Sequence, residues 1–364
     1  MSNLLKDRYN RIALEELAED IQLVYRDFQV EEFLDSIFDE TWNDLELKDR
    51  VYRISKKLGC YLPADYQEAI RVIDQVIPHY GTWVSGFAGF FPIFIELYGL
   101  DEANWETSMA ALARYTPYAS SEIAVRPFIL NNEERMMSQM YEWSNDEDEL
   151  VRRLASEGCR PQLPWAQSLP NFKNDASPIL PIIERLRTDK STHVQKSIAN
   201  NLNDISKTHP ELVIEIAKKW YGENEVTDWV VKQGCRTLLK KGIREALIIF
   251  GYNDGTSISV ENFSLNVSEI SIGESATFSF ELFTTNATKV RIEYAIDFVK
   301  KNGKRSRKIF KISETSLKKD ERKLYEKTHS FIDRSTRQHN EGVHTISLII
   351  NGIVRESLDF RLES

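Results

Sequence analysis

The sequence has few cysteines and no cysteine motif. Only 3 of its 364 residues are cysteine, and Cys60, Cys159 and Cys235 lie far apart and form no CxxC pair. This spacing argues against a disulfide scaffold and against a cysteine-ligated metal. It predicts three small buried residues in a reducing compartment.

Long apolar runs are also missing. The most apolar stretch, residues 86–95, is broken by Pro92 and followed by Glu96, whereas a membrane span needs about 18 apolar residues. The first ten residues carry charges and no apolar segment, unlike a signal peptide. The 6 histidines show no metal-ligand spacing such as HExxH. We therefore predict a cytoplasmic protein with no membrane partner and no metal.

Charge is unevenly distributed along the chain. The formal net charge of −9 argues by itself against a nucleic-acid partner. Between Val151 and Arg244, however, 16 Lys and Arg stand against 10 Asp and Glu, a balance of +6. A local basic face on an acidic protein can still bind phosphates.

Two kinds of periodicity divide the chain. Up to about residue 250 apolar residues recur at spacings of three and four, as in residues 14–24, which is typical of helices. From residue 258 apolar and polar residues alternate, as in residues 278–282 and 290–298, which predicts strands. A turn-rich stretch, residues 252–257, lies between them. We predict a helical domain over residues 1–252 and an all-β, immunoglobulin-like sandwich over residues 258–364.

A hairpin signal in the second part is strongly basic. Asn302-Gly303 predicts a type I′ turn, because both residues tolerate positive φ. Its neighbours Lys301, Lys304 and Arg305 are candidates for contacts with DNA phosphates. The alternative is a solvated hairpin, because edge strands are often rich in lysine.

The helical part is internally repetitive. Residues 150–157 align with residues 194–201 and, more loosely, with residues 230–237, at spacings of 44 and 36 residues. A second helix is predicted between each pair, so the pattern indicates a HEAT-like helical-repeat solenoid. Periodicity alone favours a protein-interaction scaffold.

Each aligned segment places a cation after its apolar anchor. These cations are Arg152, Lys196 and Lys232, and the third segment adds Arg236. Equivalent positions of stacked repeats line up, so they would form a stripe suited to a DNA backbone. A solvated helix face is the alternative.

The most specific strings lie within residues 150–207. They run Leu150–Trp165 (LVRRLASEGCRPQLPW), Ser177–Leu186 (SPILPIIERL) and Ser197–Lys207 (SIANNLNDISK). These strings strongly resemble AlkC, a DNA alkylation-repair glycosylase related to AlkD, over most of residues 1–245. One branch of that family also carries a C-terminal immunoglobulin-like domain. The resemblance implies excision of cationic bases, 3-methyladenine or 3-methylcytosine, from double-stranded DNA without a cofactor. Nothing in the sequence signals an obligate oligomer, so we expect a monomer.

This chemistry suits carboxylates. A base methylated on a ring nitrogen is already cationic and leaves without protonation. The enzyme then needs an anion beside the sugar, where positive charge grows, and a water held in line, and carboxylates supply both.

Three acids fit the resemblance: Glu122, Glu157 and Asp204. Glu157 lies on the apolar stripe of its helix, and its alternative role is a structural ion pair with Arg160. Asp204 could instead stabilise a helix end. Glu122 could simply favour the positive end of a helix, because it follows two serines at a predicted helix start.

The same strings contain further DNA-binding candidates. Trp165 lies in a predicted loop after Arg160, where the resemblance implies a cleft wall beside the lesion, although a lone tryptophan is usually a core residue. Arg153 and Arg160 are candidate phosphate contacts. A non-catalytic DNA-binding scaffold and a protein-interaction solenoid remain the alternative functions.

Overall fold

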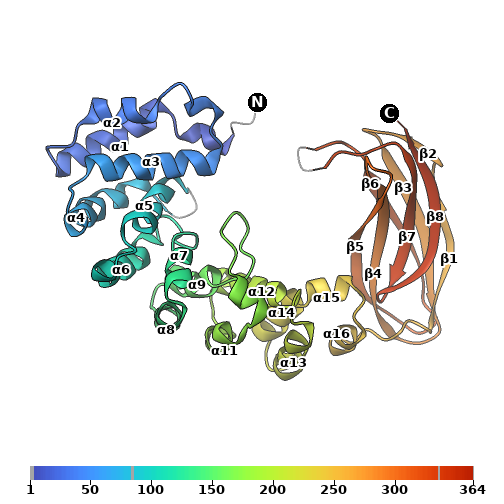
Figure 1. Ribbon diagram of the computed structural model, residues 1–364. Helices are drawn as coiled ribbons and strands as arrows, with labels where there is room; N and C mark the ends of the chain where they lie inside the picture. Colours follow the sequence, from blue (N-terminus) through green and yellow to red (C-terminus); the bar gives the residue numbers. More distant parts are fainter. Residues whose placement is uncertain (1–3, 83–85, 335–336, 364) are drawn as a thin grey trace. The chain divides into compact units, whose positions relative to one another are not determined.

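The computed structural model describes residues 4–82, 86–334 and 337–363. Helices occupy the N-terminal part and strands the C-terminal part (Figure 1), which confirms the predicted fold class. The chain forms two compact units: one comprises the residues up to His209 together with Gly222–Gly234, and the other comprises Pro210–Tyr221 and the residues from Cys235 onward.

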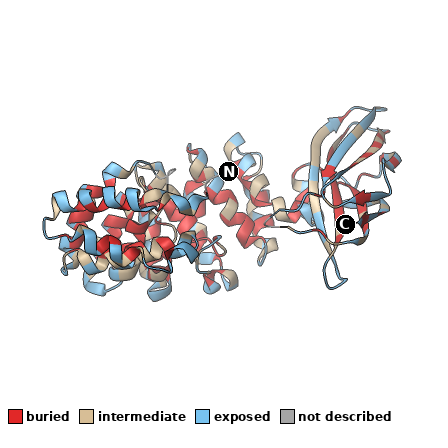
Figure 2. Cartoon of the chain, turned by 90° about the horizontal axis from the view of Figure 1, so that it is seen from above, coloured by how far each residue is buried: buried red, intermediate tan, exposed pale blue. Residues whose placement is uncertain are grey.

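The first unit is a stack of short helices. Side chains cap their N-termini, as where Asn10 accepts a hydrogen bond from the Ala13 amide and Asp148 accepts one from the Leu150 amide. The helices bury their apolar stripes against one another (Figure 2). They are α1 (Arg11–Val24), α2 (Val30–Ile37), α3 (Leu47–Tyr61), α4 (Tyr66–Val76), α5 (Phe90–Tyr98), α6 (Trp105–Tyr115), α7 (Arg126–Asn131), α8 (Glu133–Trp143), α9 (Glu149–Gly158), α10 (Pro170–Asn174), α11 (Leu180–Leu186), α12 (Thr192–Ile205) and α14 (Glu225–Gly234).

The first two aligned segments lie in α9 and α12, and the third runs from the end of α14 into α15. The helices α9, α12 and α14 pack as neighbours with α12 in the middle. The approach of α12 to α14 is close enough that a Cβ atom on Gly234 would lie 2.8 Å from the Cβ of Leu202. A side chain at position 234 would push the two helices apart. The helix predicted between the first two segments is α11, preceded by a 3-10 turn at Ser177–Ile179.

The second unit joins three helices to a β-sandwich. The helices are α13 (Pro210–Trp220), α15 (Arg236–Lys240) and α16 (Arg244–Ile249). The strands are β1 (Ile258–Leu265), β2 (Glu269–Ser271), β3 (Ser275–Thr284), β4 (Thr288–Val299), β5 (Arg305–Leu317), β6 (Arg322–Ser330), β7 (Gly342–Ile350) and β8 (Ile353–Glu363). One sheet has the order β1-β3-β6 and the other β2-β8-β7-β4-β5. The β2–β8 pair is parallel and the other pairs are antiparallel.

The predicted alternation builds the core of the sandwich. The alternating apolar residues of β3 and β4 are buried and face a shared apolar cluster: Phe278, Phe280, Leu282, Val290, Ile292, Tyr294, Ile296 and Phe298. Because side chains alternate between the two faces of a strand, this pattern gives each sheet one buried face.

The predicted hairpin between β4 and β5 is confirmed, but its predicted type I′ turn is wrong. Gly303 has a positive φ of 76°, whereas Asn302 is not among the residues with positive φ. The Gly303 amide donates to the Lys300 carbonyl and the Lys300 amide donates to the Lys304 carbonyl, both at 2.8 Å. This pattern is a three-residue loop, which needs only one left-handed residue, so Asn302 keeps its ordinary backbone.

The structure also bears on the predictions for the cysteines, for membrane spans and for the boundary between helices and strands. Cys159 and Cys235 are buried, but Cys60 is exposed on α3, so the prediction of three buried cysteines is wrong. Over the described ranges, no helix is long and apolar enough to cross a membrane. The change from helix to strand falls between Ile249 and Ile258, and the division into separate domains at residues 252–258 stays a prediction.

Candidate active site

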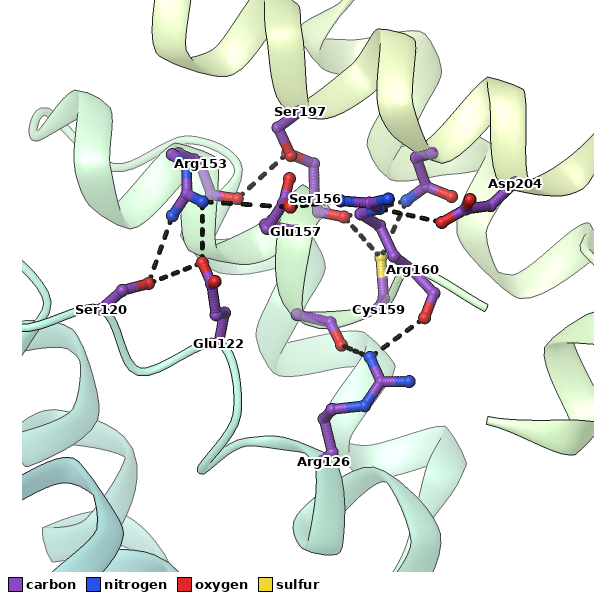
Figure 3. Close-up of polar contacts among 12 residues, drawn as sticks. Ser120, Glu122, Arg126, Arg153, Ser156, Glu157, Cys159, Arg160, Ser197 and Asp204 are labelled. Atoms are coloured by element: carbon purple, nitrogen blue, oxygen red, sulfur yellow. Dashed lines mark hydrogen bonds and ion pairs between the residues drawn. The ribbon is translucent and has the colours of Figure 1, made fainter. Parts of the chain in front are cut away.

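The three predicted acids come from three separate segments of the first unit. Glu122 lies in the turn that precedes α7, Glu157 in the last turn of α9, and Asp204 in the last turn of α12. The packing of α9 against α12 brings the two helix ends together. Figure 3 shows Glu122, Glu157 and Asp204 along one continuous polar network.

Arg160 joins Glu157 to Asp204. Its Nη1 lies 2.5 Å from Glu157 Oε1 and its Nε lies 2.9 Å from Asp204 Oδ2. These side chains are almost fully buried, with residue exposures of 5% for Glu157, 7% for Arg160 and 1% for Asp204. Burial opposes the charge of Arg160, but attraction to both carboxylates outweighs it and raises the pKa of the guanidinium. The structural pairing of Glu157 with Arg160 is therefore present, and it includes Asp204 as well.

Arg153 extends the network to the third acid. Its Nη2 lies 2.7 Å from Glu122 Oε2 and 3.9 Å from Glu157 Oε1. Ser120 donates a hydrogen bond to Glu122 Oε2 at 2.7 Å. At the other end, Lys207 Nζ lies 2.8 Å from Asp204 Oδ1. Each acid thus has at least one cation as a partner, which offsets the cost of burying a carboxylate.

The carboxylate oxygens are not equally engaged. Both oxygens of Asp204 are held, one by Arg160 and one by Lys207. The hydrogen bond from Arg160 reaches Oε1 of Glu157, and the hydrogen bond from Ser120 reaches Oε2 of Glu122. Within the described residues, no hydrogen bond reaches Glu157 Oε2 or Glu122 Oε1, so these two oxygens are unengaged in hydrogen bonding. These two oxygens can accept hydrogen bonds from a water.

Two further buried side chains, Arg126 and Cys159, lie close to the acids. Arg126, at the start of α7, donates from Nη1 to the carbonyls of Gly158 at 2.9 Å and Arg160 at 3.0 Å. Burial lowers the pKa of Arg126 to about 10. Burial raises the pKa of the neighbouring Cys159 thiol to about 12, so that thiol is not an activated nucleophile. No group of three or more His, Cys, Asp or Glu side chains among the described residues is placed to hold a metal ion.

Trp165 lies in the loop between α9 and α10, as predicted, and is not a core residue. It is 79% exposed, and its backbone has a φ of 64°, which is uncommon for a residue other than glycine. Lys48 Nζ donates to the Trp165 carbonyl at 3.3 Å. The loop therefore presents a large aromatic ring to solvent.

The cations of the predicted stripe differ in exposure and in their partners. Lys196 is exposed on α12 and Lys232 is half-buried on α14. Arg152 is held by Asp189, with Nε 2.7 Å from Oδ2, and by the Asp146 carbonyl at 2.9 Å. Arg152 thus has a structural role, and its contact with phosphate stays a prediction.

The remaining basic candidates belong to the second unit. Arg236 begins α15 and is half-buried. Lys301 and Lys304 are exposed in the hairpin, whereas the exposed Arg305 donates to Thr345 Oγ1 at 2.8 Å and to the Val343 carbonyl at 2.9 Å. Their roles in DNA binding stay predictions.

Sequence reasoning missed Arg126, Ser120 and Lys207. Lys207 had a visible signal, because it follows Asp204 by three positions at a helix end. Arg126 had none, because its partners are backbone carbonyls.

Two family models match the chain. The DNA alkylation repair enzyme model matches residues 119–246, which include all three acids. The model of the C-terminal Ig-like domain of the uncharacterised protein YhaZ matches residues 259–364.

Two similar proteins match almost the whole chain. The uncharacterized protein YhaZ of Bacillus subtilis (strain 168) is 48% identical over 359 residues, covering 98% of this chain and 99% of that protein. The solved structure of the Pseudomonas fluorescens alkylpurine DNA glycosylase AlkC, bound to DNA containing an abasic site analog, is 32% identical with a TM-score of 0.95. That comparison covers 100% of both chains.

Proposed function

Because the chain belongs to the AlkC family of DNA alkylation-repair enzymes, we propose that it is a monofunctional DNA glycosylase. Its substrates are cationic alkylated bases in duplex DNA, 3-methyladenine and 3-methylcytosine, and it acts in base excision repair. The observation that carries the proposal is the convergence of Glu122, Glu157 and Asp204 in one network that leaves two carboxylate oxygens unengaged.

The proposed reaction is hydrolysis of the N-glycosidic bond. The bond between the sugar C1′ and the base breaks, and its electron pair neutralises the cationic base. Positive charge then develops on the sugar, where nearby carboxylates stabilise it. A water bound by Glu157 Oε2 and Glu122 Oε1 attacks C1′, and one of its protons passes to a carboxylate.

Asp204 has a different part in this scheme. Its two oxygens are held by Arg160 and Lys207, so it adds negative charge to the site and fixes Arg160. Arg160 in turn fixes Oε1 of Glu157, which orients the unengaged oxygen. All three acids are therefore assigned to the active site, with Glu157 and Glu122 nearest the water.

DNA contacts are proposed for the basic and aromatic candidates. Trp165, with its exposed ring, is proposed to contact the lesion-bearing nucleotide, and cation–π attraction to a methylated base contributes about 0.5–2 kcal/mol. Arg152, Arg153, Arg160, Lys196, Lys232 and Arg236 are proposed to hold the DNA backbone, as are Lys301, Lys304 and Arg305 in the hairpin. Arg160 reaches DNA only if it leaves a carboxylate.

The experiment is release of methylated bases from duplex DNA treated with a methylating agent. We expect wild type to release 3-methylated bases, and Glu157→Gln and Asp204→Asn to lose release while still binding the duplex. Glu134→Gln, a substitution of an exposed glutamate in α8, is the matched control. Binding without release by wild type would contradict the proposal.

The alternative is a non-catalytic DNA-binding scaffold. It is favoured by the ion pairing of all three acids, because paired acids can serve structure alone. Binding without release by wild type would favour this scaffold. If wild type does release bases and both substitutions leave release and binding unchanged, the protein is an enzyme but the two acids are structural.

A further inference from the structure

We infer that Lys48 and Arg126 are positioning residues for Trp165, holding the loop between α9 and α10 at its tip and at its base. The inference rests on the proposed function for its meaning in catalysis. Its structural part, the restraint of Trp165, can be measured without any activity.

Arg126 closes the base of the loop. The side chain is fully buried, and its Nη1 binds the carbonyls of Gly158 and Arg160, where the chain leaves α9. Its Nε donates to the carbonyl of Gln167, where the chain returns toward α10. One planar guanidinium thus ties together the two ends of the segment that contains Trp165.

Lys48 holds the tip from another part of the chain. It lies 117 positions from Trp165 in sequence, in the first turn of α3, and its Nζ donates to the Trp165 carbonyl at 3.3 Å. The ammonium also lies 5.4 Å from the centre of the Tyr52 ring. Tyr52 donates to Glu96 Oε1 at 2.6 Å. An exposed lysine is usually free to rotate, but this one lies between an aromatic ring and a backbone carbonyl.

The restraint matters because the backbone of Trp165 is in an unfavourable region. A φ of 64° is costly for a tryptophan, and such a conformation persists only where its surroundings hold it. With the base and the tip fixed, the ring is held outward before DNA arrives. A preorganised contact loses less conformational entropy on binding than a mobile one.

The first test is 19F NMR of protein containing 5-fluorotryptophan. The chain has 7 tryptophans, and Trp165→Phe identifies the resonance of Trp165. We expect Lys48→Met to shift and sharpen that resonance, and Lys48→Arg to restore it, because arginine can still donate to the carbonyl. An unchanged resonance in Lys48→Met would overturn the inference, whether or not the protein proves to be a glycosylase.

The second test is a double-substitution cycle on binding of lesion-containing duplex. We expect Lys48→Met to weaken binding about threefold to tenfold, the range for one hydrogen bond. In a Trp165→Ala background it should have no further effect. The slope of log Kd against log salt should stay unchanged, because a positioning lysine releases no counterions. Additive effects, or a slope reduced by about one, would show that Lys48 contacts phosphate directly and would overturn the inference.

Arg126→Lys tests the base of the loop. It keeps the charge but removes the fork that joins Gly158, Arg160 and Gln167, so we expect the Trp165 resonance to sharpen. Thermal unfolding shows whether the variant is folded. If it is not folded, the Lys48 experiments decide the inference; if it is folded and the resonance is unchanged, Arg126 has no positioning role.

Discussion

Two buried arginines in this molecule have almost the same chemical surroundings. Arg160, in the helical stack, lies between Glu157 and Asp204. Arg291, in the sandwich, lies between Glu293 at 2.5 Å and Glu314. In both cases burial opposes the charge of the guanidinium, but the carboxylates outweigh it and raise its pKa.

The two arginines differ in the accessibility of their carboxylate partners. Arg291, Glu293 and Glu314 lie on the paired strands β4 and β5, with Arg291 and Glu314 in register. Glu293 is fully buried, and its Oε2 is sealed from solvent without a hydrogen-bond partner in the described structure. The Arg160 group joins separate helices, connects through Arg153 to Glu122, and leaves Glu157 Oε2 unengaged. A buried ion network is thus a candidate site only where part of it can reach a substrate.

The largest expected effect is on the chemistry of the helical network. Glu157→Gln keeps the shape of the side chain but removes the carboxylate that we propose lies beside the sugar and the water. We expect single-turnover base release to fall about 100-fold to 1000-fold, the loss typical of removing one preorganised electrostatic contact. Binding to duplex should change little, and thermal unfolding should show a folded protein. A fall in release that only matches a fall in the folded fraction would assign Glu157 to structure.

The opposite behaviour is expected in the sandwich. Glu293→Gln leaves Arg291 with one carboxylate fewer in a buried place, so we expect the free energy of unfolding to fall by about 3 kcal/mol. Base release by the folded protein should be unchanged. Urea unfolding and single-turnover release, measured on the same preparation, give both quantities. If the Glu293→Gln variant is fully folded but no longer releases bases, the contrast between the two arginines is wrong.

A pH dependence is expected to come from the sandwich. Burial, aided by Arg337 and His339, lowers the pKa of His329 to about 4. The unfolded chain therefore binds a proton at a higher pH than the folded chain, and stability is lost as the pH falls from about 6.5 to 4. The loss approaches 1.4 kcal/mol per pH unit for this one group.

Urea unfolding between pH 7 and pH 4.5 measures this slope. His329→Gln should flatten it, because glutamine does not titrate yet can still form a hydrogen bond with Tyr294. A slope that survives in the variant would point instead to His344, whose pKa burial also lowers.

The sequence predicts the elements better than their details. Helix and strand periods come from the burial of one face, so they are visible in the order of residues. The Asn302-Gly303 pair locates the hairpin, but it fits more than one turn, and the length of the loop decides which one forms.

The candidate site is predictable only in part. The pairing of Glu157 with Arg160 follows from their spacing of three on one segment. The contact of Arg160 with Asp204 does not, because 44 positions separate them and only the packing of α9 on α12 joins them. Lys48 and Arg126 leave no trace in the sequence, because they bind carbonyls that every residue has.

The smallest expected effect concerns the hairpin of the sandwich. Lys301 and Lys304 are exposed, whereas Arg305 is tied to β7 by its hydrogen bonds. We expect Lys301→Ala with Lys304→Ala to reduce the slope of log Kd against log salt by up to about two, one for each lost phosphate contact. Release from saturated complexes should not change. Lys318→Ala with Lys319→Ala, a pair of exposed lysines beyond the other end of β5, is the matched control. If both pairs lower the slope equally, the sandwich attracts DNA by its general charge and the hairpin has no special part. If only the first pair lowers it, the sandwich contributes binding through one edge while the helical network contributes the chemistry.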